Sequence, residues 1–140
     1  MRNLLLAIIL FLFIYNPLSG QENKQHPIDI QQDKCLEENP TTYGMKQCYI
    51  KAAKEWDKEL NKYYKLLYNK LSDSGKIKLQ DAQRAWIAFR DKEFALMSTF
   101  YYEELEGTMY HVMASGDMTY LIKKRALELK TYYETMNYSE

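Results

Sequence analysis

Residues 79–91 read LQDAQRAWIAFRD, and this stretch decides the fold. Its apolar residues recur at spacings of three and four, which places them on one face of a helix. These residues are Leu79, Ala82, Trp86 and Phe89. Polar groups at the edge of such a face need partners. The stretch is therefore interpreted as a structural brace within a helical fold.

The same spacing continues on both sides of this stretch. An apolar series from Met45 to Leu71 predicts a helix over residues 44–72, and the stretch itself belongs to a second helix over 76–102. Between them, residues 72–75 read SDSG, which favours a tight turn. Two long amphipathic helices joined by a short polar link most simply form an antiparallel hairpin.

A third helix is predicted over residues 118–136, with Asp117 or Thr119 as its cap. Residues 101–118 are expected to be the least regular part, because Gly107 and Gly116 bracket only a short apolar piece. No alternation of polar and apolar residues indicates a strand. The sequence therefore predicts an all-α fold, a small bundle built on the hairpin, with one disulfide.

Antiparallel pairing about a tip near Gly75 predicts which residues face each other. Positions whose numbers sum to about 150 should lie at one level, so Tyr64 should pack on Trp86. Asn61, helped by Asp57 one turn away, should satisfy the guanidinium of Arg90, because an unpaired buried charge is costly. Leu60 should lie at the same level as this pair, and Leu67 near Gln83.

The N-terminus has the pattern of an export signal. Residues 1–20 contain Arg2, an apolar run from Leu4 to Tyr15 and small residues at the end, as in a secretory signal peptide. A run of about a dozen apolar residues is short for a membrane-spanning helix, which needs roughly 20. We expect a signal peptide over 1–20, a flexible leader over 21–34 and one domain over 35–138. The mature protein is then periplasmic or extracellular, without stable membrane insertion.

Export determines how the two cysteines, Cys35 and Cys48, are interpreted. In an oxidising compartment an even number of cysteines predicts a disulfide. A metal site is disfavoured, because His26 and His111 have no further ligand at suitable spacing. Without residues 1–20 the chain has 18 Lys and Arg against 19 Asp and Glu. This balance gives no support for nucleic-acid binding, which needs a basic face.

Signals for catalysis and for cofactors are weak. Ser98, Ser115 and His111 have no positioning motif of a nucleophilic enzyme, and no Gly-rich phosphate loop is present. Glu103, Glu104 and Glu106 lie close in sequence, but adjacent residues on a helix point in different directions and nothing indicates a cleft around a glycosidic bond. We expect no enzyme, cofactor or metal. These acids are better suited to docking a basic partner, and the tyrosines around them (Tyr101, Tyr102 and Tyr110) suit an interface.

Taken together, several segments resemble the LprI-like lysozyme inhibitor N-terminal domain family of exported bacterial proteins. They are Cys35 and Cys48, the run WDKELNKYYKLL from Trp56 to Leu67, the run from Leu79 to Asp91, Gly107 with Thr108, and Arg125 with Leu129. Their order and spacing cover roughly residues 35–130. Members commonly have a second cysteine pair, whose places are taken here by Phe94 and, approximately, Asp117. Without that bridge, residues 101–118 should be more mobile, held by Phe94, Met97 and Phe100.

The resemblance implies a small helical bundle that binds and inhibits lysozyme in the bacterial envelope. It also implies structural roles for the matching motif residues: Trp56, Asp57, Leu60, Asn61, Tyr64, Gln83, Trp86, Arg90, Asp91, Arg125 and Leu129. The expected partner surface is the loop of Glu103, Glu104, Glu106, Gly107, Thr108, Tyr110 and His111. The alternative is a structural or adaptor bundle of the envelope that binds another protein.

Overall fold

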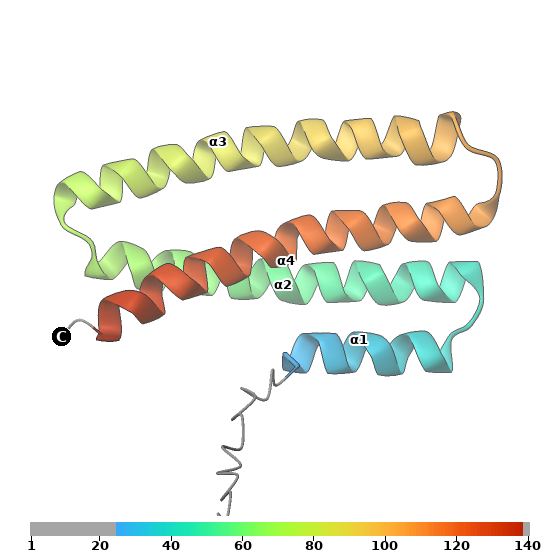
Figure 1. Ribbon diagram of the computed structural model, residues 1–140, viewed down its shortest axis with the longest axis horizontal. Coiled ribbons are helices and arrows are strands. Elements are labelled where there is room, and N and C mark those ends of the chain that lie inside the picture. Colours follow the sequence, from blue (N-terminus) through green and yellow to red (C-terminus); the bar gives the residue numbers. More distant parts are fainter. Residues whose placement is uncertain (1–24, 139–140) are drawn as a thin grey trace, which may run out of the picture.

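The computed structural model describes residues 25–138, so the expected signal peptide and residues 21–24 lie outside it. The described chain forms helices and no strand. In order they are α1 (Pro27–Glu38), α2 (Thr42–Lys70), α3 (Asp73–Ser98), a π-helical turn η1 (Thr99–Glu103) and α4 (Thr108–Tyr138). Figure 1 shows them lying lengthwise beside one another. The predicted all-α fold is confirmed.

The predicted hairpin is present, since α2 and α3 run in opposite directions (Figure 1). Hydroxyl side chains begin both helices, because the first turn leaves backbone N–H groups without helical partners. The Thr41 hydroxyl accepts a hydrogen bond from Gly44 N at 3.0 Å, and the Ser72 hydroxyl accepts one from Gly75 N at 3.3 Å. The two helices are separated only by residues 71–72.

The closest partner of α2 is nevertheless α4, which runs in the same direction as α2 (Figure 1). These two helices supply six of the seven residues of the main core, and α3 supplies the seventh, Leu79. The others are Trp56, Leu60 and Leu67 of α2, and Ile122, Ala126 and Leu129 of α4.

Side-chain size explains why α4 lies closer to α2 than α3 does. Buried Ala114, Ser115 and Ala126 of α4 are small, which lets the backbone of a neighbouring helix approach. The side of α3 that faces the bundle carries long side chains instead, including the half-buried Trp86 and Phe94. The tryptophan at the centre of the core is Trp56, which is 1% exposed.

The segment 101–118 is more regular than the sequence indicated. Helix α4 begins at Thr108 rather than near 118, and it passes through Gly116 without a break. Asp117 and Thr119 therefore lie within the helix and do not cap it. A glycine inside a helix costs only about 1 kcal/mol, and burial of Val112 and Ala114 on the preceding turn offsets this.

The expected flexible leader also needs correction, because Pro27–Glu38 is a helix. Its start is fixed locally: Pro27 occupies the first turn, and Nδ1 of His26 accepts a hydrogen bond from Ile28 N at 3.3 Å. This helix is only weakly amphipathic, so the periodicity of its sequence does not reveal it. Contacts with residues distant in sequence hold it in place. Ile28 packs on the core, and Asp29 pairs with Lys123 of α4 at 2.7 Å.

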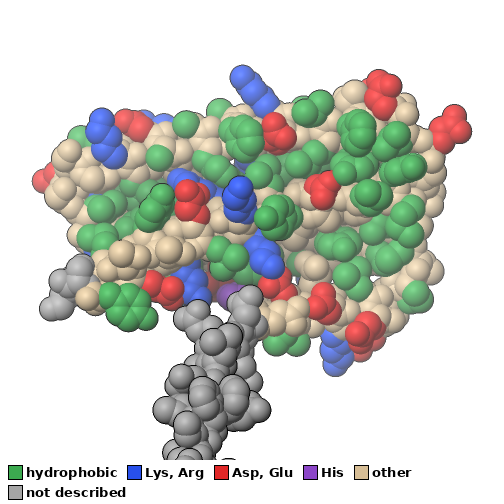
Figure 2. Space-filling view, viewed as in Figure 1, with side chains coloured by type: hydrophobic (Ala, Val, Ile, Leu, Met, Phe, Trp, Pro, Cys, Tyr) green, Lys and Arg blue, Asp and Glu red, His purple; other side chains and the backbone are tan. Residues whose placement is uncertain are grey.

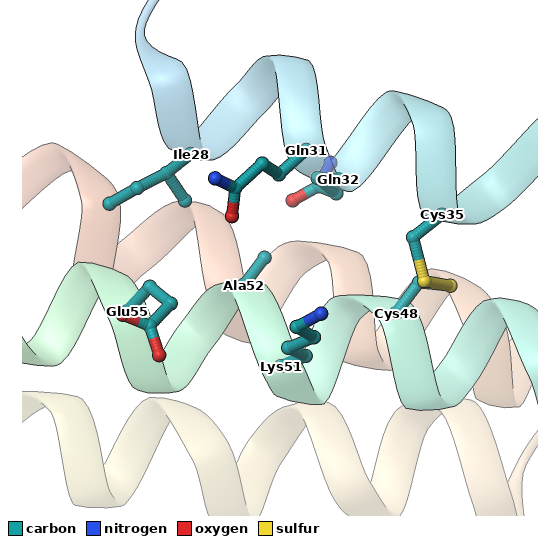
Figure 3. A pocket seen from close by; sticks show the side chains of 8 residues that line it. All are labelled: Ile28, Gln31, Gln32, Cys35, Cys48, Lys51, Ala52 and Glu55. Atoms are coloured by element: carbon teal, nitrogen blue, oxygen red, sulfur yellow. A yellow bond between two sulfur atoms is a disulfide. The ribbon is translucent and has the colours of Figure 1, made fainter.

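The predicted disulfide joins α1 to α2. Cys35 and Cys48 are bonded, with their Cα atoms 5.7 Å apart. In Figure 3 the bridge lies at one end of a narrow space between the two helices, whose volume is only about 10 Å³. That space has no room for a substrate.

Between residues 25 and 138, no helix is long and apolar enough to cross a membrane.

Candidate functional site

The residues expected to bind a partner come together at the end of the bundle where α3 leads into α4. Glu103 ends η1, Glu104 and Glu106 lie in the following bend, and α4 then begins at Thr108. The chain reverses at Gly107, whose φ of 121° is strained for any residue with a side chain. All of these residues are exposed, while Tyr110 and His111 in the first turn of α4 are half-buried.

An aromatic stack fixes the geometry of this end. The rings of Tyr102 and His111 lie 4.3 Å apart and 20° from parallel, across the reversal at Gly107. The ammonium of Lys46, from the first turns of α2, lies 5.3 Å from the Tyr102 ring, close enough for a cation–π attraction. Three segments therefore meet here. The stack was not predicted from the sequence, because nothing local relates these positions before the reversal is known.

Asp117, which takes the approximate place of one cysteine of the second family pair, forms a hydrogen bond instead of a disulfide. The Tyr101 hydroxyl donates to Asp117 Oδ2 at 2.5 Å and so links η1 to α4. Because this bond favours the protonated phenol, it raises the pKa of Tyr101 above its ordinary value of 10.0. Phe94 and Met97 are half-buried, as expected for residues that hold this segment, but Phe100 is 48% exposed.

The charge of this end is one-sided. Residues 93–122 include five acids and no Lys or Arg. Within the described chain, the carboxylates of Glu103, Glu104 and Glu106 form no ion pair. Figure 2 shows hydrophobic side chains gathered over the end at the right of the view, with acidic side chains at its outer corner. A surface of this kind is suited to a cationic protein partner.

Motif residues at the other positions serve the fold. The buried Arg125, 8% exposed, donates from Nε to Gln83 Oε1 at 3.1 Å and from Nη1 to Glu128 at 2.8 Å. Its guanidinium also lies 6.0 Å from the Trp86 ring. This arginine therefore ties α3 to α4. Trp56, Leu60 and Leu129 are core residues.

The predicted pairing of Arg90 with Asn61 is wrong. Arg90 instead donates to neighbouring Asp91, from Nε at 2.9 Å and from Nη2 at 2.6 Å, while Asn61 donates to Asp57 within α2. Because α3 stands away from α2, Arg90 lies along its own helix, 5.5 Å from the Trp86 ring.

The ring contacts differ from the prediction as well. Tyr64 stacks on Tyr68 of its own helix, with ring centroids 6.2 Å apart. Trp86 instead lies close to Arg125 of α4. A groove of about 310 Å³ separates α2 from α3 at this level, and its lining includes Asn61, Tyr64 and Gln83.

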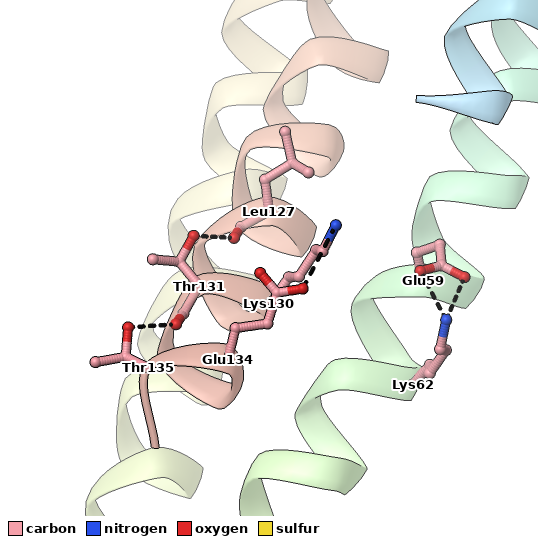
Figure 4. Close-up of polar contacts among 7 residues, drawn as sticks. All are labelled: Glu59, Lys62, Leu127, Lys130, Thr131, Glu134 and Thr135. Carbon is pink, nitrogen blue, oxygen red and sulfur yellow. Dashed lines mark hydrogen bonds and ion pairs between the residues drawn. The ribbon is translucent and has the colours of Figure 1, made fainter. Parts of the chain in front are cut away.

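Apart from the pair of Asp29 with Lys123, the ion pairs elsewhere in residues 25–138 join residues of one helix and do not converge on a pocket. Figure 4 shows Lys62 bonded to Glu59 within α2, and Lys130 paired with Glu134 within α4. The bond to Glu59 raises the pKa of Lys62. In residues 25–138, no three His, Cys, Asp or Glu side chains are placed to hold a metal ion.

Comparison with known proteins assigns the family. Residues 33–129 match the family model described as "Lysozyme inhibitor LprI". The chain belongs to the LprI family. The match includes the disulfide, the tryptophan motif, the acidic end and Arg125, so the LprI assignment covers both the brace and the candidate surface.

Two similar proteins show how far the similarity extends. An uncharacterized protein of Rhizobium meliloti (strain 1021) is 35% identical over 92 residues, which are 56% of this chain and 64% of that protein. The crystal structure of an uncharacterized protein from Burkholderia thailandensis superposes with a TM-score of 0.72 at 28% identity. That match covers 79% of this chain and 54% of the other. This chain therefore spans less than two thirds of either relative.

Proposed function

We propose that this protein is a non-enzymatic exported protein of the cell envelope that binds a lysozyme-type cell-wall hydrolase and blocks its cleft. Membership of a lysozyme inhibitor family supports the target class. We assign the binding surface to the end of the bundle around Gly107. It is exposed and acidic, and ring and hydrogen-bond contacts join its two sides, as suits an inhibitory loop.

Two contacts support a preformed geometry for this loop. The stack of Tyr102 on His111 and the bond from Tyr101 to Asp117 hold both sides of the reversal. A preformed loop loses little conformational entropy on binding, so more of its contact energy appears as affinity. Unpaired glutamates around it accelerate encounter with a basic enzyme, an effect that salt suppresses.

The test is lysis of bacterial cell walls by lysozyme in the presence of the mature protein at low salt. We expect slower lysis and direct binding at micromolar protein. Replacing Glu103, Glu104 and Glu106 with Lys should lower the association rate at least tenfold, and the difference should shrink near 0.15 M salt, where the Debye length is only about 8 Å.

A control with the same change in net charge replaces exposed acids at the opposite end of the bundle, namely Asp73 and Asp81 near the start of α3 and Glu134 near the end of α4. It should leave the association rate within about twofold, because these residues lie away from the loop. Normal lysis and no binding by the wild-type protein would refute the proposal. Capture of an endogenous envelope protein without lysozyme would instead favour the adaptor function.

A further inference from the structure

A polar groove follows the hairpin between α2 and α3. It has two parts, of about 310 Å³ and about 370 Å³, and Tyr64 and Gln80 line both parts, so the groove is continuous. The side chains along it recur at spacings of three and four on each helix, which places each set on one helix face. They are Asn61, Tyr64, Lys65, Tyr68 and Asn69 of α2, and Gln80, Gln83, Arg84 and Ile87 of α3. We call this the hairpin groove.

Most polar groups of the hairpin groove are not used by the fold. Gln80 is half-buried, yet its side-chain amide forms no hydrogen bond with residues 25–138, and neither do the hydroxyls of Tyr64 and Tyr68. Gln83 accepts a bond from Arg125 through Oε1 at 3.1 Å, so its amide nitrogen remains able to donate to a ligand. A primary amide both donates and accepts hydrogen bonds, and the groove therefore offers both to a ligand.

Two tyrosines supply the flat apolar part of the groove. The rings of Tyr64 and Tyr68 are half-buried, their centroids lie 6.2 Å apart, and their planes are 27° from parallel. A tyrosine buries the face of its ring while its hydroxyl forms hydrogen bonds at the edge. A pyranose ring has the matching surfaces, because its C–H groups form an apolar patch and its hydroxyls project around the edge. Aromatic rings beside amides therefore suit a sugar.

The charge and the shape of the groove disfavour other ligands. Within the described chain, no Asp or Glu lines either part, whereas the exposed Lys65 and Arg84 do, so a cationic ligand is unsuited. Arg84 also pairs with Asp81 at 3.5 Å, and two cations are too few for a nucleic acid. A partner helix needs a row of apolar anchor sites. Of the described residues along the groove, only Ile87 is aliphatic.

From this lining we propose that the hairpin groove binds a short oligosaccharide of N-acetylated sugars. The acetamido group of such a sugar has one N–H donor and one carbonyl acceptor, which match the acceptor and the donors of the Gln80 amide. Tyr64 and Tyr68 pack against the sugar rings, and the amide nitrogen of Gln83 donates to a sugar hydroxyl. Each part of the groove has the volume of a small ligand site, about 300 Å³ or more. The groove therefore holds a chain of sugars rather than a single one.

The hairpin groove is distant from the acidic surface around Gly107. Its residues lie toward the turn between α2 and α3, whereas Gly107 lies at the other end of the bundle (Figure 1). Both surfaces can therefore be occupied together, and sugar binding does not depend on the proposed function. The glycan that lysozyme cleaves is built from N-acetylated sugars. A protein held on this glycan would meet the hydrolase at its substrate.

The first experiment titrates isotopically labelled mature protein with chitotetraose, a soluble tetramer of N-acetylglucosamine, and follows the backbone amides by NMR. We expect saturable shifts at residues 61–69 and 80–87, with a dissociation constant below about 1 mM. Cellotetraose has the same linkage without acetamido groups, so it should bind at least tenfold more weakly. The absence of saturable shifts with chitotetraose, shifts centred elsewhere, or equal affinity for the two sugars would overturn the proposal.

The second experiment compares the chitotetraose affinity of two glutamine variants. Gln80→Ala removes an amide without a hydrogen bond in the described chain, so it should leave the fold intact and weaken binding by about tenfold, the effect of one hydrogen bond. Gln32→Ala is the matched control, because Gln32 is also a half-buried glutamine and lies on α1. It should bind like the wild-type protein. Equal losses in both variants, or no loss in Gln80→Ala, would contradict the proposal. Neither experiment contains a hydrolase, so sugar binding and the proposed function can fail separately.

Discussion

Replacing Arg125 with alanine tests whether α3 is held to the bundle by this one side chain. Arg125 is 8% exposed and donates to Gln83 of α3 and to Glu128 of its own helix. Leu79 is the only residue of α3 that is buried. A residue that joins α3 to α4 should therefore matter more for stability than its position at the edge of the core indicates.

The magnitude follows from four contributions. The bond between Arg125 and half-buried Gln83 is worth about 1.5 to 3 kcal/mol, because its donor is charged. The pair with Glu128 adds little, since the Glu128 side chain is 46% exposed. Packing of the aliphatic part of the Arg125 side chain adds about 0.8 kcal/mol per buried methylene. Alanine also removes a buried charge and its desolvation cost, which reduces the net loss of stability. We expect Arg125→Ala to destabilise the protein by about 2 to 3 kcal/mol, or roughly 10 °C in Tm.

Urea unfolding followed by circular dichroism gives the free energy directly. Arg125→Met keeps the stem and should lose only about 1 kcal/mol, while Lys124→Ala on the exposed side should change it by less than about 0.5 kcal/mol. A double-mutant cycle with Gln83→Ala should give a coupling of about 1 kcal/mol. An unchanged free energy in Arg125→Ala, or a coupling near zero, would refute this account of how α3 is held.

Three further predictions concern single contacts. Replacing Cys35 and Cys48 with serine opens a loop of sequence separation 13 and should lower the free energy of unfolding by about 3 kcal/mol, and an unchanged urea midpoint would contradict this. Burial lowers the pKa of His26 below 6.5. Its contribution to stability is therefore present above pH 6.5 and is lost as pH falls through the lowered value. An NMR titration of His26 in the folded protein should show this low pKa. The raised pKa of Tyr101 makes its contribution present below pH 10.0 and lost as pH rises through the raised value, and Asp117→Asn should move the phenol absorbance titration to lower pH.

The helices were predictable because their apolar residues recur regularly, but their partners were not. Periodicity shows that α3 and α4 each have an inner face, and it does not show which helix lies closer to α2. The small buried Ala126 of α4, packed with Trp56 and Leu60, permits that close approach, whereas the bulky Trp86 lies between α3 and the core. The Asn61 and Arg90 pairing failed for this reason, since it assumed close contact between α2 and α3.

The candidate surface was predictable only in part. Glu103, Glu104 and Glu106 are neighbours in sequence, so their clustering was visible. The stack of Tyr102 on His111 depends on the reversal at Gly107. It also depends on the early start of α4, whereas Gly116 had indicated a break in the helix. A glycine shows that a break is permitted, and only the burial of the surrounding residues decides whether one occurs.

The parallel course of α2 and α4 has a consequence for folding kinetics. The Thr119 hydroxyl donates to the backbone oxygen of Tyr49, 70 residues earlier in the chain, and the main core joins residues of similar separation. Contacts so distant in sequence require closure of a long loop before they stabilise anything. The bundle should therefore fold more slowly than a helical hairpin of equal size, and its core cannot form until synthesis has passed Leu129.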